Sequence, residues 1–499
     1  MLINKLLFGN QYRLKRHLWI GLLLGSTLFQ IGGKIPLSQA KTLGYCQQVK
    51  DAIAQKHQLL NSSLQGNRNA RTRYQKLLKN HAQDLQECRR QTWPPSQGIW
   101  LRLYACDLRP GYIEEILDRI VNRGYNKVYV EVLGDSQVLL PVADNPTPWP
   151  SVVRSPGQER ADLLAQAIQK GRERGLKVYA WMFSMNFGYT YSLRPDRQGA
   201  IARNGKGETA VITTSEGSQA FVDPYNLQAK TDYNKLVKSV LRRRPDGVLF
   251  DYIRYPRGEG SNSVVSKVQD LWIYGDAAFN ALYNRGLNNK GKDLIRRFAS
   301  RGYITAGDVR QLDQLYPSEG SPLWQGRNPA PQEMQLPPEA RQPVWQWELW
   351  QLSVAHAAQG VLDFLATAMY PVQKQGLITG AVFFPDANQP VRQTGYDSRL
   401  QPWDRFPKNM EWHPMLYAVC NSSACISEQL QRVLQQATSQ TRVSPVLAGV
   451  WGKKWNNKPP LETQMASLRQ FSPKVESVSH FAFSWQEPKF TQERQSCRP

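Results

Sequence analysis

A carboxylate at the end of a predicted buried strand is the feature of this sequence best suited to chemistry. Residues 246–256 read Asp-Gly-Val-Leu-Phe-Asp-Tyr-Ile-Arg-Tyr-Pro, so that an apolar run from Val248 to Phe250 ends at Asp251. Short runs of β-branched and aromatic residues between turn residues are typical of buried parallel strands. Catalytic groups gather at the C-terminal ends of such strands. We predict a catalytic or substrate-binding Asp251; the alternative is a carboxylate that only hydrogen-bonds to the next loop.

The elements that would position this carboxylate form a repeating strand–helix pattern. Parallel strands joined by helices predict an α/β fold, and eight of them predict a closed (β/α)8 barrel of the TIM type. Side chains alternate along a strand, so Leu249 and Asp251 share one face, and Asp251 points into the barrel mouth if that face is the interior. The predicted strands cover residues 99–105, 127–133, 176–183, 247–252, 378–384, 412–419, 445–451 and 478–485.

Two segments fall outside the barrel pattern. Residues 41–92 carry apolar residues at helical spacing on both sides of a polar stretch with Gly66, which predicts a hairpin of two antiparallel helices. The barrel domain is then 93–499. Within it, residues 257–344 are too long for an ordinary barrel loop. Because this insertion follows the fourth strand and Asp251 directly, we predict that it lies over the barrel mouth as a lid or substrate wall.

Residues 1–40 have the pattern of a signal peptide. Lys and Arg residues precede an apolar stretch, 18–31, and small residues stand at Ser38 and Ala40. An uncleaved anchor is the alternative. No later segment is apolar and long enough to span a membrane. We therefore predict an exported protein in the periplasm, the cell envelope or the extracellular space.

Charge and cysteine content restrict the partners. The formal net charge is +23, with basic residues scattered along the chain and no nucleic-acid-binding motif. This pattern is typical of a basic surface that faces solvent, and the alternative is an anionic polymer as partner. Both are favoured over nucleic-acid binding. The cysteines form no Cys-x-x-Cys pair and the six histidines are dispersed, so we predict neither a metal site nor a cofactor.

An even number of cysteines in an exported chain is typical of disulfides. Cys46 and Cys88 are equidistant from the Gly66 turn, so antiparallel helices place them face to face. Cys420 and Cys425 are predicted to close a small loop after strand six. Cys106 and Cys497 are then left to pair with each other, since strand eight neighbours strand one in a closed barrel.

Five segments resemble, in order and spacing, the glycosyl-hydrolase-like family 10, a group of bacterial, often exported barrels. The resemblance extends over about 93–487 apart from the insertion, and it implies glycoside chemistry. Two positions differ: Glu131-Val132-Leu133 stands where the family's second strand has an Arg, and Asp251-Tyr252 where its signature often doubles the Asp. The similar segments are 246–256, 134–141 with Pro148-Trp149, 175–181, 221–224 and 413–417.

Glycoside hydrolysis requires two carboxyl groups on either side of the scissile bond. Asp251 is our first candidate. For its partner we rank Asp386, just past strand five, level with Glu131 on strand two. Glu131 could instead form a buried ion pair, and Asp386 could cap a turn. Strand seven, where many barrel glycosidases place the second carboxylate, ends here in Val-Trp-Gly-Lys and offers no acid.

Aromatic and polar residues near the predicted strand ends are candidates for substrate binding, since an aromatic face suits the apolar face of a sugar ring. Core packing is the alternative for each. Three functions remain open: a glycoside hydrolase acting on a cell-envelope or extracellular polysaccharide, such as a peptidoglycan-type or anionic glycan; a barrel that binds glycan without cleaving it; and an envelope scaffold. The candidate binding residues are Trp181, Tyr252, Arg254, Tyr255, His413, Tyr417, Trp451 and Trp485.

Overall fold

A computed structural model describes residues 42–134, 136–215, 217–393 and 395–496. The chain divides into two units, 1–39 and 40–499. The predicted signal peptide, 1–40, lies outside the described residues, as do Asp135 and Cys497. Among the helices of the described residues, none is long and apolar enough to cross a membrane.

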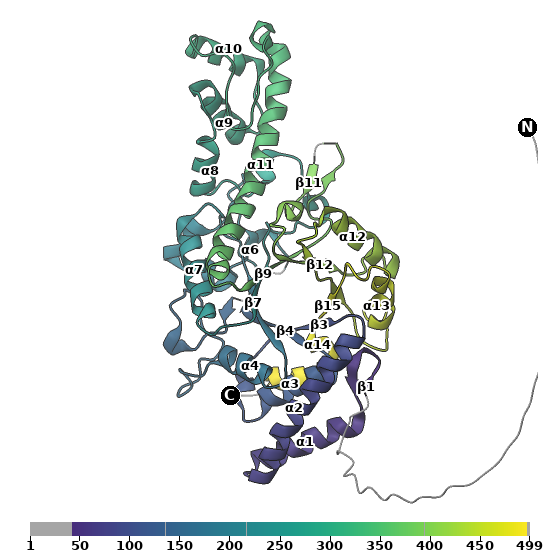
Figure 1. Cartoon of the computed structure of the whole chain (residues 1–499). Coiled ribbons are helices and arrows are strands. Elements are labelled where there is room, and N and C mark those ends of the chain that lie inside the picture. The colour runs from purple at the N-terminus through teal and green to yellow at the C-terminus, as the bar shows by residue number, and fades with distance from the viewer. Residues whose placement is uncertain (1–41, 135, 216, 394, 497–499) are drawn as a thin grey trace, which may run out of the picture. The chain divides into compact units, whose positions relative to one another are not determined.

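Eight parallel strands close into a barrel, which confirms the predicted fold class (Figure 1). Each strand pairs with the next along the chain, and the last, β15, pairs with the first, β3, at Ser477–Ser96 and His480–Ile99. A barrel closed in this way has no exposed sheet edge. Its strands are β3 Ser96–Leu101, β4 Lys127–Gly134, β6 Lys177–Phe183, β7 Gly247–Asp251, β9 Ile378–Phe383, β12 Glu411–Leu416, β14 Val446–Ala448 and β15 Ser477–Phe481.

Helices cover the outer face of the barrel. They are α3 Tyr112–Asn122, α4 Leu163–Arg172, α7 Leu227–Leu241, α11 Pro338–Gln373, α12 Ser423–Gln436, α13 Leu461–Arg469, α14 Phe483–Gln486 and α15 Pro488–Ser496. Short elements in the loops are β5 Gln137–Val138, α5 Tyr189–Ser192, α6 Ala210–Thr213, β10 Pro390–Val391, β11 Gly395–Asp397 and β13 Arg442–Val443.

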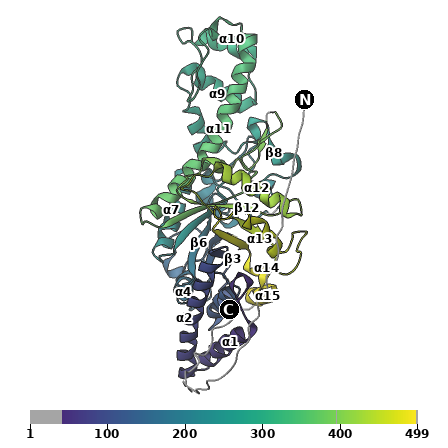
Figure 2. The same ribbon diagram turned by 45° about the vertical axis from the view of Figure 1, so that its right-hand side comes forward.

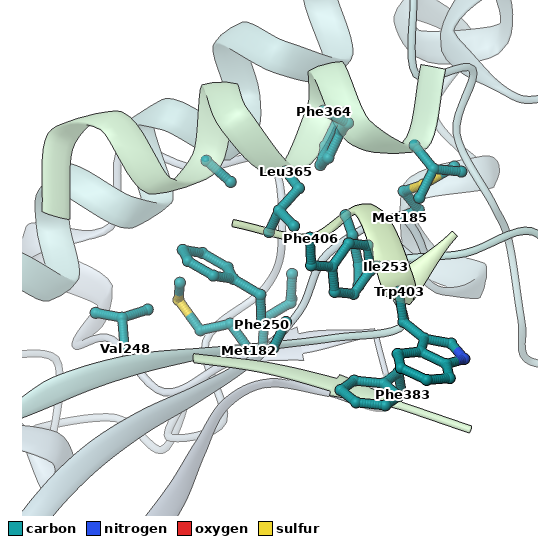
Figure 3. Packing of buried hydrophobic residues seen from close by; sticks show 14 of the residues in the cluster. Met182, Met185, Val248, Phe250, Ile253, Phe364, Leu365, Phe383, Trp403 and Phe406 are labelled. Atoms are coloured by element: carbon teal, nitrogen blue, oxygen red, sulfur yellow. The ribbon is translucent and has the colours of Figure 1, made fainter. Parts of the chain in front are cut away.

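The alternation along β7 has the predicted orientation. Val248 and Phe250 point outward and join the core beneath α11, where Figure 3 shows them near Phe364 and Leu365. Leu249 instead belongs to an interior cluster with Trp100, Tyr129, Tyr179 and Trp181. The Leu249 face is therefore the barrel interior, and Asp251 shares it.

The predicted helical hairpin is α1 Lys50–Leu64 and α2 Arg68–Gln91. Gly66 makes the turn between them with φ +91°, a backbone angle that favours glycine. Cys46, which lies between the paired strands β1 Thr42–Leu43 and β2 Gln47–Gln48, forms the predicted disulfide with Cys88. Asp118 of α3 fixes the hairpin to the barrel, because its buried carboxylate accepts hydrogen bonds from Tyr74 of α2 (2.6 Å) and from Arg174 (2.8 Å).

Cys420 and Cys425 form the second predicted disulfide. Cys106 is also disulfide-bonded, and its predicted partner, Cys497, lies outside the described residues.

The long insertion contains β8 Val264–Val265, α8 Asp276–Tyr283, α9 Asn289–Arg301 and α10 Ala306–Leu315. These three helices pack against α11, and Figures 1 and 2 both show them beside its first half. The last part of the predicted insertion belongs to α11, which begins at Pro338, since proline suits the first turn of a helix. The residues lining the mouth cavity described below come from segments other than α8–α10, and the lid role of the insertion stays a prediction.

Candidate active site at the barrel mouth

Asp251 is a buried carboxyl group at the C-terminal end of β7, with 8% of its surface exposed. The indole nitrogen of Trp181 donates to Oδ2 (3.0 Å), and the backbone amide of Tyr252 donates to Oδ1 (2.7 Å). Tyr252 has φ +51°, in the left-handed region that non-glycine residues rarely adopt outside functional sites and turns. Burial raises the pKa of Asp251, against the lowering effect of these two hydrogen bonds and of the charges of Arg254 and Arg102.

Glu131, two strands away on β4, is held in an ion pair. Oε2 of Glu131 accepts from Nε of Arg102 (2.8 Å) at the end of β3. Gly134 leaves room for the Glu131 carboxylate, because a Cβ there would lie 2.3 Å from its carboxyl carbon. Glu131 pairs in register with Trp181, the residue that bonds Asp251. Asp251 pairs in register with Phe183, two residues further along β6 than Trp181. With strands about 4.8 Å apart and a rise of about 3.3 Å per residue, the two acidic residues are therefore roughly 12 Å apart at the backbone.

Arg254 provides a buried positive charge next to Asp251. Its guanidinium lies 4.6 Å from the ring of Tyr252 and 5.8 Å from that of Phe384, and Nη1 donates to the carbonyl of Tyr255. Among the described residues no carboxylate bonds Arg254 directly, and cation–π contacts of this kind hold its guanidinium. Burial lowers the pKa of Arg254, while Asp251 and Tyr252 act to raise it.

A row of aromatic rings extends from Asp251 to the protein surface. Trp181 lies 6.1 Å from Phe481, Phe481 lies 5.2 Å from Trp485, and Trp485 lies 4.0 Å from Trp455 between ring centroids. Trp455 and Trp485 are partly exposed, whereas Trp181 is buried. Tyr417 lies beside the row, 6.3 Å from Phe481, and the nearby charge of Asp251 together with burial raises the pKa of its hydroxyl well above the usual value.

A cavity of about 260 Å³ opens next to these groups. Arg102 and Tyr252, the neighbours of the two carboxylates, line it together with Phe183 of β6. Polar side chains from the loops after β4 and β6, including Ser136 and Asn186, complete the wall. The cavity therefore offers both charged and hydrogen-bonding groups to a polar ligand.

Four residues that were predicted for the site lie away from Asp251, Glu131 and the aromatic row. Asp386 is 56% exposed and paired with Arg399 (3.1 Å). Tyr255 is buried and donates to the carbonyl of Ala357. His413 is enclosed deeper in the barrel, 3.3 Å from Glu411 at the N-terminal end of β12. The indole of Trp451 bonds Tyr125.

Trp451 lies away from the site because the strand before it is shorter than predicted. The predicted strand 445–451 ends early, because β14 stops at Ala448, so Trp451 is not at a strand end. A Cβ at Gly449 would lie 2.7 Å from Nε2 of Gln464, so a larger residue there would displace the Gln464 side chain as the chain leaves the strand. The ring of Trp451 then packs on Tyr45, 5.1 Å away. Trp485 is also not at a strand end, because β15 stops at Phe481 and Trp485 lies in α14, yet its ring reaches the aromatic row.

Arg102, Phe481 and Trp455 also belong to the site but were not predicted from the sequence. Arg102 follows the last residue of β3, so the rule that pointed to Asp251 also applied to it. Phe481 ends β15 on its interior face. Trp455 lies in a loop with Lys453, Lys454 and Lys458, where no strand pattern marks it. In the described residues no cluster of three or more His, Cys, Asp or Glu has a geometry that could hold a metal ion.

Part of the barrel is similar in sequence to a known protein family. The family model described as Glycosyl hydrolase-like 10 matches residues 99–275. This match confirms the resemblance found in the motifs, over the part of the barrel from β3 through β7 and the start of the insertion. No curated protein is significantly similar to the chain in sequence.

Solved structures similar to the chain share low sequence identity with it. One is the PgaB (BpsB) glycoside hydrolase domain from Bordetella bronchiseptica, with 16% identity and a TM-score of 0.47, covering 80% of this chain and 98% of that one. Another is a GH20 exo-β-N-acetylglucosaminidase from Vibrio harveyi, with 10% identity and a TM-score of 0.38, covering 80% and 52%. A hypothetical protein from Ruminiclostridium thermocellum has 14% identity and a TM-score of 0.24, covering 32% and 77%.

Proposed function

We propose that the protein is a glycoside hydrolase that cleaves a cell-envelope or extracellular polysaccharide at the barrel mouth. The observation that carries the proposal is the contrast between two neighbouring acidic groups. Burial raises the pKa of Asp251, whereas Glu131 is bonded to the guanidinium of Arg102. Environments that separate the protonation states of two carboxyls are the usual basis of acid and base assignments in glycosidases.

In this proposal Asp251 is the general acid. Its proton passes to the glycosidic oxygen as the bond to the anomeric carbon breaks, and Glu131, bonded to Arg102, serves the second role. Glu131 either removes a proton from the attacking water or attacks the anomeric carbon itself. The anomeric configuration of the first product, read by NMR, distinguishes these routes, because direct attack retains the configuration and water attack inverts it.

The aromatic row supplies the binding surface. Sugar rings stack on aromatic faces, and the row from Trp181 to Trp455 leads from the buried acid to partly exposed rings. Lys453 and Lys454, exposed beside Trp455, favour a glycan that carries negative charge. We therefore propose a polymeric substrate, bound along this row, rather than a single small sugar.

The deciding experiment is the release of reducing ends from envelope polysaccharides by the wild type and by Asp251→Asn. The variant keeps the shape of the side chain and removes its acidic proton. Turnover is expected to fall by about 10²–10⁴-fold, the usual cost of losing an acid or base. Equal cleavage by both proteins would make Asp251 structural.

A glycan-binding barrel without activity is the second candidate, favoured by the low exposure of Asp251. In that case neither protein releases reducing ends, yet both retain the same glycan on affinity gels. Loss of retention in Trp455→Ala would then identify the aromatic row as the binding surface.

A further inference from the structure

A second and larger cavity lies at the opposite end of the barrel from Asp251. Its volume is about 1160 Å³, and its lining includes the first residue of several strands, among them Lys127 of β4, Lys177 of β6, Glu411 of β12 and Ser477 of β15. One wall is the face of α2 that carries Gln83, Gln86 and Arg90. Figures 1 and 2 both show α2 beside the barrel. The cavity is therefore a groove between the hairpin and the N-terminal ends of the strands.

The floor of the groove holds more positive than negative charge. Glu411 is its buried carboxylate, with the ammonium of Lys127 at 3.8 Å. The charges of Lys127 and Arg442, together with a hydrogen bond from His413, lower the pKa of Glu411 to about 2 although burial opposes them. Burial is the main cause that lowers the pKa of Lys127; Glu411 opposes it, and the charges of Lys177 and Arg442 act in the same direction as burial. Lys127 therefore lies near two further cations as well as near Glu411.

Two of these cations are available to a ligand. Within the part of the chain that the structure describes, the exposed side chains of Lys177 and Arg442 form no ion pair and no hydrogen bond. Lys474, on the loop before β15, is a third exposed lining cation of this kind. An anion in the groove would relieve the repulsion among the cations and gain charge-assisted hydrogen bonds.

The remaining lining favours a hydroxylated ligand over an apolar one. Neutral hydrogen-bonding side chains, including Gln83, Asn126, Thr438, Thr441 and Ser444, line the groove together with apolar ones such as Leu434, a mixture that suits the hydroxyl groups and the apolar faces of sugars. Pockets for apolar ligands are instead lined mainly by hydrophobic and aromatic groups. The groove is also far larger than one inorganic anion requires, because pockets of about 300–1000 Å³ hold complete small-molecule ligands.

We propose that this groove binds an acidic oligosaccharide segment, whose carboxylates pair with Lys177 and Arg442 while its hydroxyl groups bond the neutral side chains. The site is separate from the proposed catalytic mouth and requires no cleavage. It also gives the hairpin a role, because α2 forms one wall and the Cys46–Cys88 bridge fixes the end of α2.

The test is calorimetric titration of the full chain with a tetragalacturonate, with a neutral cello-oligosaccharide of equal length and with inorganic phosphate. Wild type is compared with Lys177→Gln/Arg442→Gln. Tetragalacturonate is expected to bind the wild type, and the double variant is expected to weaken this binding by at least about tenfold, since each cation supplies a charge-assisted hydrogen bond. The neutral oligosaccharide and phosphate should bind far more weakly.

The matched control is Lys374→Gln/Lys489→Gln, which removes two exposed lysines outside the groove and changes the net charge equally. Its affinity for tetragalacturonate should equal that of the wild type. Asp251→Asn should also keep full affinity, and this separates the groove from the mouth even if no glycan is cleaved.

Three results would overturn the proposal. The first is unchanged affinity in Lys177→Gln/Arg442→Gln. The second is an equal loss in the control pair, which would indicate a nonspecific charge effect. The third is phosphate or the neutral oligosaccharide binding as tightly as tetragalacturonate, because the groove would then recognise a bare anion or a sugar without its charge. Circular dichroism and thermal melting of each variant verify the fold.

Discussion

The indole nitrogen of Trp181 donates a 3.0 Å hydrogen bond to Oδ2 of Asp251. The same ring continues the aromatic row toward Phe481. One side chain therefore links the buried carboxyl to the surface on which we propose that the glycan stacks. A change in Trp181 should accordingly alter the protonation of Asp251 as well as ligand binding.

Trp181→Phe keeps an aromatic ring and removes the N–H donor. Because this hydrogen bond lowers the pKa of Asp251, its loss should raise that pKa further. The expected results are an upward shift in the carboxyl titration of Asp251, followed by ¹³C NMR, and a matching shift in the pH profile of kcat/KM on a cleaved glycan. Trp485→Phe, which does not bond Asp251, is the control. An unchanged Asp251 titration in Trp181→Phe would contradict this role.

The two candidates for the second carboxylate can be separated by Glu131→Gln and Asp386→Asn. Glu131 is bonded to Arg102 near Asp251, whereas Asp386 is exposed and paired with Arg399. We expect Glu131→Gln to lower kcat by about 10²–10⁴-fold and Asp386→Asn to change it less than about threefold. Turnover of each variant on the same polysaccharide is the measurement. The reverse order would transfer the role to Asp386.

The two described disulfides should differ in their contributions to stability. Cys46 and Cys88 are 42 residues apart in sequence, and Cys420 and Cys425 only 5. In the chain-entropy account a longer closed loop restrains the unfolded chain more, so Cys46→Ser/Cys88→Ser should lose about 2–4 kcal/mol of unfolding free energy and Cys420→Ser/Cys425→Ser less. Urea unfolding under non-reducing conditions gives both values. A larger loss from the short loop would be inconsistent with this account.

Acid should destabilise the fold through buried histidines. Burial, aided by the charge of Arg285, lowers the pKa of His356 to about 3, and burial together with Arg89 lowers that of His480 to about 3. An ordinary histidine has a pKa of 6.5, so below pH 6.5 the unfolded chain binds more protons than the folded one. Stability therefore falls as pH decreases from 6.5 toward 3.

His356→Gln should reduce the slope of unfolding free energy against pH, near pH 5, by about 1.4 kcal/mol per pH unit, the value for one proton. Urea titrations at several pH values measure this slope. His57→Gln, which changes an exposed histidine, should leave it unchanged. An identical slope in His356→Gln and the wild type would show that His356 does not account for the acid sensitivity.

Local patterns in the sequence determined the main elements of this protein. Eight short apolar runs separated by amphipathic helices predicted the barrel, because strand and helix periods are properties of neighbouring residues. The symmetry of the hairpin about Gly66 predicted the Cys46–Cys88 bridge, and alternation along β7 predicted which face carries Asp251. The signal peptide stays a prediction.

Tertiary structure decided which side chains meet. Arg102 reaches Glu131 because β3 and β4 are neighbours whose ends converge at the mouth, and Trp181 reaches Asp251 across β6 and β7. Trp451 packs outside the group because β14 ends three residues before it. The groove beneath the barrel requires α2 and the first residues of several strands to lie together. These contacts join residues far apart in the chain, and their geometry depends on strand order, loop path and packing, none of which a local sequence pattern encodes.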